Sequence, residues 1–131
     1  MRDFFYKKLD AYKWAKELVI FIYKILDCFP AFESYALSDQ IRRAAISVPS
    51  NIAEGMGRMS LKERIHFLDI AYGSLAEVDC QMDIAYTLKY INDNKYKEFQ
   101  TLVENTGVTI IGLKKYLEEK NNNQRATDEK K

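Results

Sequence analysis

The chain has 131 residues, of which 47% are hydrophobic and 30% are charged. This length supports one globular domain with its own hydrophobic core and leaves no room for a second. The formal charge of +1 excludes a global attraction to nucleic acid or anionic membranes, so any such binding must depend on local patches. We find no apolar run that could span a membrane and no secretory signal at the N-terminus, so we expect a cytoplasmic protein.

The first expected element is a helix over residues 11–29. Apolar residues recur there at spacings of three and four, which is the pattern of a helix that buries one face. Pro30 prevents the helix from continuing. The members of this apolar stripe are Ala11, Ala15, Leu18, Ile22, Ile25 and Phe29.

A second helix is expected from Leu37 or Ser38 to Gly55–Gly57, where a glycine suits a left-handed C-cap. An interior proline, Pro49, costs roughly 3 kcal/mol because one backbone hydrogen bond is lost. We expect nearby polar side chains to satisfy the freed backbone groups. Charged neighbours are expected to form an ion-pair network that fixes the register of the helix. The polar residues of this segment are Arg42, Arg43, Ser47, Ser50, Asn51 and Glu54.

Two further helices follow. Ser60 and Glu63 fit a capping box, so the third helix should begin there. The segment Asn92-Asp93-Asn94 supplies turn and N-cap chemistry for the fourth helix, whose apolar positions alternate at spacings of three and four. The predicted core positions are Ile65, Leu68, Tyr72, Leu75 and Met82, with Phe67, Ala71, Val78, Ala85 and Leu88 widening that face, and then Tyr96, Phe99, Val103, Thr106, Ile110, Leu113 and Leu117.

The pattern as a whole predicts an all-α fold. Four helices joined by short turns pack most simply as an antiparallel up-down-up-down four-helix bundle, which we assign to residues 1–120. Residues 121–131 have almost nothing apolar to bury, so we expect a disordered polar tail. Aromatic side chains remain outside the main stripes and either widen the core or form an interface between subunits. These are Phe4, Phe5, Tyr6, Trp14, Phe21, Tyr23, Phe67, Tyr86 and Tyr90.

Catalytic and metal-binding patterns are weak. Glu63 and His66 have the spacing of a di-iron ligand pair, but the chain has a single histidine. A carboxylate pair of Glu54 with Glu77 or Asp79 is a second option for acid–base chemistry, although an ion-pair network is the simpler interpretation. We therefore expect no enzyme activity, no cofactor and no metal. Cys28 and Cys80 are expected to be two buried free thiols.

Basic residues are the candidates for nucleic-acid binding. Three lysines fall on one outer face of the first helix, two more come before it, and two arginines flank the turn into the third helix. An ordinary solvated surface has the same composition, but a homo-oligomer would repeat these modest patches and add up their attraction to phosphate. The candidates are Lys7, Lys8, Lys13, Lys16, Lys24, Arg58 and Arg64.

Three stretches together carry a family resemblance. They are residues 40–55, then Phe29-Pro30 with Glu33, Tyr35 and Leu37, and residues 67–77. In order and spacing, these stretches resemble the bacterial proteins encoded in intervening sequences of 23S ribosomal RNA genes, a family that also includes the accessory protein of diversity-generating retroelements. The likeness extends from about Leu9 to Leu117.

The resemblance implies a four-helix bundle that assembles as a homo-pentameric ring and has no enzyme activity. It also implies that a polar network of Arg43, Ser47, Asn51, Glu54 and Glu77, together with Gly73 and Ser74, holds the second and third helices together. The retroelement members bind nucleic acid through a basic outer surface, whereas this chain is nearly neutral. We therefore expect a homo-oligomeric scaffold associated with RNA or a ribonucleoprotein, or alternatively a protein-interaction module with no nucleic-acid role.

Overall fold

The computed structural model describes residues 5–129, and residues 1–4 and 130–131, including Phe4, lie outside the described part. The described residues form helices and contain no strand. In chain order the elements are the 3₁₀ helix η1 (Phe5–Lys8), α1 (Asp10–Ile25), the 3₁₀ helices η2 (Leu26–Cys28) and η3 (Ala31–Glu33), α2 (Leu37–Met56), α3 (Leu61–Thr87) and α4 (Asp93–Glu129). The prediction of an all-α chain with four main helices is confirmed.

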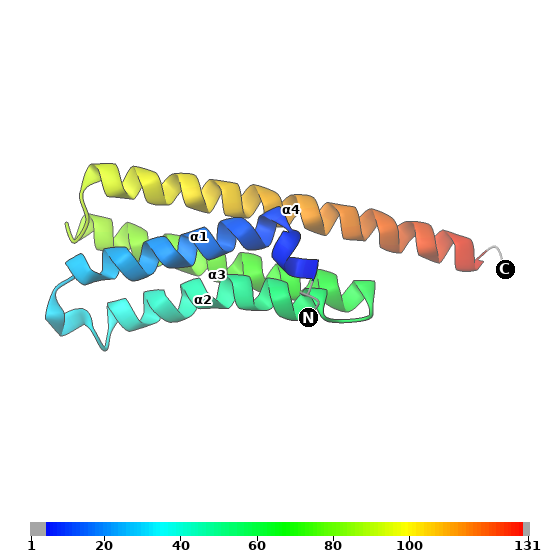
Figure 1. The fold of residues 1–131 in the computed structure, drawn as a ribbon, viewed down its shortest axis with the longest axis horizontal. Helices are drawn as coiled ribbons and strands as arrows, with labels where there is room; N and C mark the ends of the chain where they lie inside the picture. Colours follow the sequence, from blue (N-terminus) through cyan, green and yellow to red (C-terminus); the bar gives the residue numbers. More distant parts are fainter. Residues whose placement is uncertain (1–4, 130–131) are drawn as a thin grey trace.

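The four long helices lie side by side and form a bundle (Figure 1). α2 packs against both α1 and α3, and α4 also packs against both α1 and α3. α1 and α3 are therefore diagonal partners in the bundle. Consecutive helices run in opposite directions along the long axis of Figure 1, and short connections join them at the two ends.

The core contains the apolar stripes that the sequence predicts. All six members of the first-helix stripe are buried, and Phe99, Leu18 and Ile22 are among the largest fully buried side chains. Removing this apolar surface from water is the main favourable contribution to folding. Two positions predicted for the third-helix face, Tyr72 and Leu88, are instead exposed at 43% and 50%. The apolar face of α3 is therefore narrower than the sequence suggests.

The helix ends agree only in part with the sequence expectations. Ser60 Oγ accepts the Glu63 backbone N–H at 3.3 Å, and Asn92 Oδ1 accepts the Lys95 N–H at 2.8 Å, so both predicted helix starts are confirmed. The left-handed C-cap is wrong, because Gly57 has φ −82° and its N–H bonds to carbonyls of the last turn. α1 ends at Ile25, and its last predicted turn tightens into η2 before Pro30.

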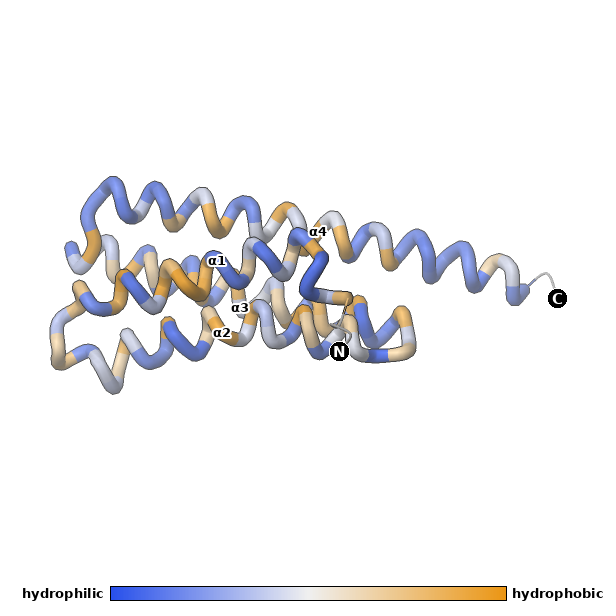
Figure 2. Tube along the Cα trace, in the orientation of Figure 1, coloured by the Kyte–Doolittle hydropathy of each residue, from blue (hydrophilic) through white to orange (hydrophobic). Residues whose placement is uncertain are grey.

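The predicted disordered tail also differs from the structure. α4 continues through residue 121 to Glu129 and projects beyond the other helices (Figure 1). Figure 2 shows that this projecting segment is mostly hydrophilic. No Pro or Gly interrupts residues 113–129, and each added residue gains a backbone hydrogen bond once a helix has formed. The lack of apolar residues therefore limits packing of this segment but does not end the helix.

The expected burial of the two cysteines is wrong. Cys28 and Cys80 are free and exposed. Cys28 falls in the short η2 helix after α1, and Cys80 lies on the solvent-facing side of α3 between Glu77 and Asp83. The apolar residues next to each cysteine in the sequence did not indicate whether its thiol faces the core or the solvent.

Candidate functional site

The seven basic candidates fall into two spatial groups. Lys13, Lys16 and Lys24 are exposed on the outer side of α1. Lys7 and Lys8 belong to η1, Arg58 follows α2, and Arg64 lies in the first turn of α3. Since η1 packs against both α1 and α2, this second group gathers at one end of the bundle.

Two arginines organise that end of the molecule. Arg64 Nε donates to the Arg58 backbone carbonyl at 2.7 Å, and its guanidinium carbon lies 5.4 Å from the centroid of the Phe5 ring. The Arg58 guanidinium lies over the Phe67 ring at 4.9 Å and forms an ion pair with Glu54 at 2.7 Å. Such contacts hold the planar guanidinium groups in place while leaving part of their surface accessible.

The exposed Lys62, at the second position of α3, adds a further cation to this region. Sequence reasoning did not select Lys62, because it alternates with acidic residues and belongs to no basic run. We call the set of Lys7, Lys8, Arg58, Lys62 and Arg64 the basic end. It is a surface of cations that can contact phosphate groups.

The three α1 lysines form a different surface. Lys13, Lys16 and Lys24 follow one helical stripe with the exposed Ile20, which is 39% accessible. We call these four residues the α1 outer face. None of its lysines forms an ion pair with another described residue. Their ammonium groups are therefore available to a partner.

The predicted polar network reduces to three residues. Ser47 Oγ and Ser74 Oγ share a hydrogen bond of 2.8 Å between α2 and α3. Asn51 Nδ2 donates to the Ser47 backbone carbonyl at 2.7 Å and to its hydroxyl at 2.9 Å. Ser47 and Asn51 lie two residues before and two residues after Pro49, but the backbone acceptor is the Ser47 carbonyl rather than that of Ala45. The Ser47–Ser74 bond joins two helices, the Asn51 bonds stay within α2, and none of them replaces the bond that proline removes.

The other proposed members of the network have different partners. Arg43 pairs with Asp39 at 3.0 Å, on the same helix, as does Arg42 at 2.8 Å. Glu54 pairs with Arg58, and Glu77 accepts from the Gln81 amide at 3.3 Å. All are local contacts within one helix or its end, so Arg43, Glu54 and Glu77 do not join the serine cluster.

Close packing accompanies the serine contact between α2 and α3. A Cβ atom placed on Gly55 would lie only 2.7 Å from Phe67 Cβ. A residue with a side chain at position 55 would therefore force the helices apart. Sequence reasoning treated Gly55 as part of a C-cap, but its buried position inside α2 shows a role in helix packing.

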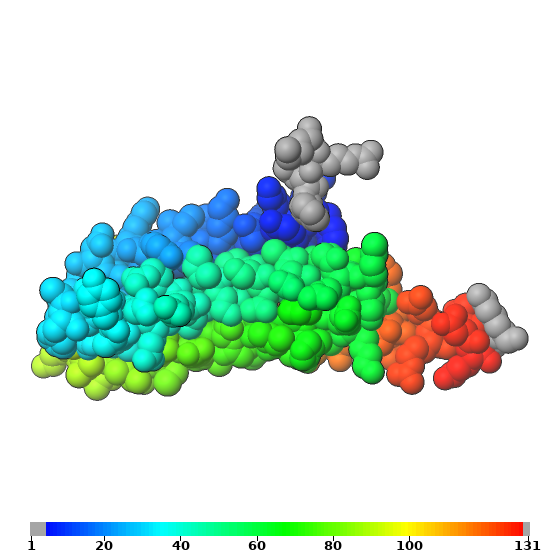
Figure 3. Space-filling model, turned by 90° about the horizontal axis from the view of Figure 1, so that it is seen from below, coloured from blue at the N-terminus to red at the C-terminus, as the bar shows by residue number. Residues whose placement is uncertain are grey.

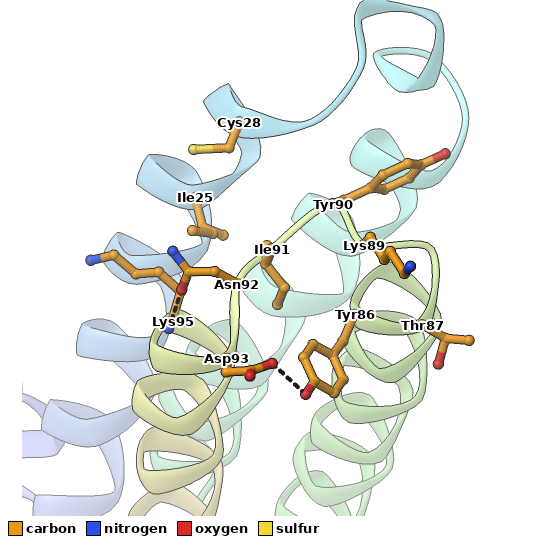
Figure 4. A pocket seen from close by; sticks show the side chains of 10 residues that line it. All are labelled: Ile25, Cys28, Tyr86, Thr87, Lys89, Tyr90, Ile91, Asn92, Asp93 and Lys95. Atoms are coloured by element: carbon orange, nitrogen blue, oxygen red, sulfur yellow. Dashed lines mark hydrogen bonds between the residues drawn. The ribbon is translucent and has the colours of Figure 1, made fainter.

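A cavity of about 740 Å³ lies at the opposite end of the bundle. Figure 4 shows it between the end of α1 and the connection from α3 to α4. Its lining residues are Ile25, Cys28, Tyr86, Thr87, Lys89, Tyr90, Ile91, Asn92, Asp93 and Lys95. Lys89 adopts a left-handed backbone conformation with φ 65°, which turns the chain out of α3.

Tyrosine hydroxyls at this end are bonded to carboxylates. Tyr86 donates to Asp93 at 2.7 Å, which raises the pKa of Tyr86 because ionisation would place two negative charges together. Tyr90 donates to Glu33 at 2.9 Å, with the same effect on the Tyr90 pKa. These contacts tie the α3–α4 connection to itself and to η3. The tyrosine residues that line the cavity therefore hold neighbouring chain segments together.

The weak catalytic candidates do not come together. Exposed His66 makes an edge contact with Phe67, at 5.7 Å between ring centroids, and lies in the first half of α3, whereas the cavity is at the far end of that helix. Within residues 5–129, no group of three or more His, Cys, Asp or Glu side chains has the arrangement of a metal site. Glu54 bonds to Arg58 and Glu77 bonds to Gln81, rather than to each other.

The aromatic residues outside the stripes differ in burial. Phe21, Tyr86 and Tyr90 are half-buried against the core and Phe67 is half-buried beside Arg58, whereas Trp14 and Tyr23 are exposed. In the described part of the chain, none of the helices is long and apolar enough for a transmembrane span.

Comparison with known proteins gives one family. The family model described as 23S rRNA-intervening sequence protein matches residues 7–112, which is about four fifths of the chain and includes α1, α2, α3 and the first part of α4. No curated protein matches the chain. The match ends within α4, so the projecting part of that helix lies outside it. The chain belongs to the 23S rRNA-intervening sequence protein family.

Proposed function

We propose that this protein is a non-enzymatic, homo-oligomeric helical scaffold that associates with RNA through its basic end. The observation that carries the proposal is the gathering of Lys7, Lys8, Arg58, Lys62 and Arg64 on η1 and the α2–α3 connection. Lysine and arginine side chains neutralise backbone phosphates and release counterions, which requires no enclosed pocket. A shallow cationic surface therefore suits a nucleic acid better than a small substrate.

Self-association gives this surface its strength. One copy presents few cations and carries a net charge of only +1, so its attraction to RNA is weak. Several copies in one assembly present several basic ends to the same nucleic acid, and effective concentration then raises the overall affinity. The resemblance to ring-forming relatives favours a pentamer. Exposed Trp14, Ile20, Ile84 and Val108 provide apolar surface for contacts between copies.

The test is binding of a fluorescently labelled RNA stem–loop, followed by anisotropy as salt is raised. We expect binding that weakens steeply with added salt. Replacement of exposed basic-end lysines, Lys8→Glu with Lys62→Glu, should reduce affinity and the salt dependence together. A matched variant with Lys97→Glu and Lys120→Glu carries the same charge change on α4 and should retain most of the binding.

A second candidate is a protein-interaction module with no nucleic-acid role. Phe32 and Tyr35, in the connection between α1 and α2, are 77% and 98% exposed and could anchor a partner protein. Absence of RNA binding even at low salt would contradict the scaffold proposal. Capture of a specific protein that depends on Phe32 and Tyr35 would then support the module.

A further inference from the structure

We infer that copies of this chain assemble head to tail, with the α1 outer face of one copy seated on the outer side of α3 of the next. The inference rests on the proposed self-association and specifies which surfaces meet. The relevant side of α3 is a stripe of Gly73, Glu77, Cys80, Asp83 and Ile84, which we call the α3 outer face. The surface that contacts it is the α1 outer face of a second copy, formed by Lys13, Lys16, Ile20 and Lys24.

The two faces lie on opposite sides of one molecule. α1 and α3 are diagonal in the bundle because each packs against both α2 and α4. Figure 3 shows α2 between α1 on one side and α3 on the other. Two surfaces on opposite sides cannot contact each other within one molecule. The α1 outer face of one copy can, however, contact the α3 outer face of the next copy. Such a heterologous contact closes into a ring when the rotation between copies allows it.

Charge favours this pairing over contacts between like faces. The α3 outer face carries two carboxylates, Glu77 and Asp83, and no lysine or arginine, whereas Asp69 of the same helix already pairs with Lys114 of α4. The α1 outer face carries three lysines without intramolecular ion pairs, and Glu17 lies beside it toward α4. Opposed like faces would repel, whereas α1 against α3 brings opposite charges together.

The faces also match along the bundle axis. Near one end, Lys24 lines a groove with Lys95 of α4, and the adjacent Tyr96 bonds to Asp83 of α3 at 3.4 Å. Lys24 and Asp83 therefore lie at about the same level.

Near the other end, Asp10 lines a groove with Leu113 of α4. The adjacent Lys114 pairs with Asp69 of α3 at 2.6 Å, so Asp10 and Asp69 share a level. The step from Asp10 to Lys24 on α1 and the step from Asp69 to Asp83 on α3 span the same number of residues.

Because the two steps are equal, residues at the same level on α1 and α3 face each other when two copies lie side by side in parallel. Lys16 falls near the level of Glu77, and Lys24 is level with Asp83. Between these charge pairs, exposed Ile20 falls near exposed Cys80. The expected contact is thus an apolar centre with an ion pair on either side, the usual arrangement of a protein interface.

Gly73 leaves room for a partner on α3. It lies inside a 27-residue helix, and a Cβ there would meet nothing within 4 Å in the described structure. A glycine in a helix interior costs about 1 kcal/mol relative to alanine, so the fold of one copy gains nothing from it. The absence of a side chain at this level would let a neighbouring α1 approach closely.

Disulfide trapping tests the inference. The variant Cys28→Ser with Ile20→Cys keeps native Cys80 and should, after oxidation with diamide, give a ladder of covalent multimers on a non-reducing gel. Cys28→Ser alone should give no cross-link, because Cys80 does not meet Cys80. A control with Cys28→Ser and Thr101→Cys, an exposed position on α4, should also remain uncross-linked.

Each outcome of the trapping has a definite meaning. A ladder beyond the dimer requires a head-to-tail contact, whereas cross-linking that stops at the dimer would indicate like faces and overturn the inference. No cross-link would also overturn it. Light scattering of the unaltered chain separates the two proposals, since an oligomer without the ladder refutes only the α1–α3 contact and a monomer refutes self-association itself.

Charge reversal supplies a second measurement. Lys16→Glu with Lys24→Glu should reduce the mass of the assembly, as should Glu77→Lys with Asp83→Lys. Combining all four substitutions restores opposite charges across the contact and should restore the assembly. A control with Lys89→Glu and Lys97→Glu should keep its mass. Unchanged mass in both double variants, or no recovery in the combined variant, would contradict the inference.

Discussion

Ser47 on α2 and Ser74 on α3 share a hydrogen bond of 2.8 Å in the middle of the bundle. The two residues are 27 positions apart, and the bond requires one relative register of the two helices. Asn51 reinforces it from the next turn of α2 through the Ser47 hydroxyl. The polar contact between α2 and α3 is therefore this serine cluster rather than a network of buried charges.

Removal of Asn51 should therefore weaken the fold. Asn51→Ala loses two hydrogen bonds in a half-buried setting, and we expect a loss of about 1–2 kcal/mol in the free energy of unfolding. Urea denaturation measures this change. Ser50→Ala, at an exposed neighbouring position, is the matched control and should change the stability by less than about 0.5 kcal/mol. Equal effects of the two substitutions would argue against the serine cluster.

Glu54 should contribute little to stability. Its side chain is 53% exposed and its ion pair with Arg58 lies within one helical turn. Exposed pairs of this type contribute about 0.5 kcal/mol or less. We expect the melting temperature of Glu54→Ala to lie close to that of the original chain. A large fall in the melting temperature would instead support the buried ion-pair network predicted from the sequence.

Two glycines should respond in opposite directions to alanine. Gly55→Ala places a methyl group against Phe67 Cβ, and overpacking of this kind costs about 1–3 kcal/mol. Gly112→Ala meets nothing within 4 Å and should gain up to about 1 kcal/mol from helix propensity. Denaturant unfolding of both variants provides the comparison. Stabilisation by Gly55→Ala would show that α2 and α3 can separate at no cost.

Alkaline pH should weaken the junction between Tyr90 and Glu33. Bonding to Glu33 raises the pKa of Tyr90 above its ordinary value of 10.0, so the stabilisation is fully present below that pH. As pH rises further, the unfolded tyrosine ionises first, and stability falls until the folded hydroxyl also ionises. Thermal unfolding across this range should show a shallower decline for Tyr90→Phe. Identical slopes for the two proteins would contradict the assignment.

The apolar stripes made most of the fold predictable. The spacing from Ala11 to Phe29 identified a buried face because burial is a periodic signal within one helix. Caps at Ser60 and Asn92 were equally visible, since each depends on residues three positions apart. The extent of α4 was not visible, because a polar helix beyond the bundle has no apolar period.

The candidate surfaces were harder to predict because they depend on contacts between helices. Arg58 and Arg64 were selected as flanking a turn, but their contacts with Phe67 and Phe5 required the folded chain. Arg43 and Glu54 are close in sequence to Asn51, yet each pairs along its own helix instead of across to α3. Closeness in sequence identified the segment that carries these charged side chains, but it did not identify the residues with which they pair.

The central claim is that several copies of this bundle act together, and the most direct measurement is the mass of the chain in solution by light scattering. The chain has a mass of 15.3 kDa. We expect a stable species whose mass is a multiple of that value, with five copies favoured. A species of 15.3 kDa that persists as concentration is raised would contradict the claim.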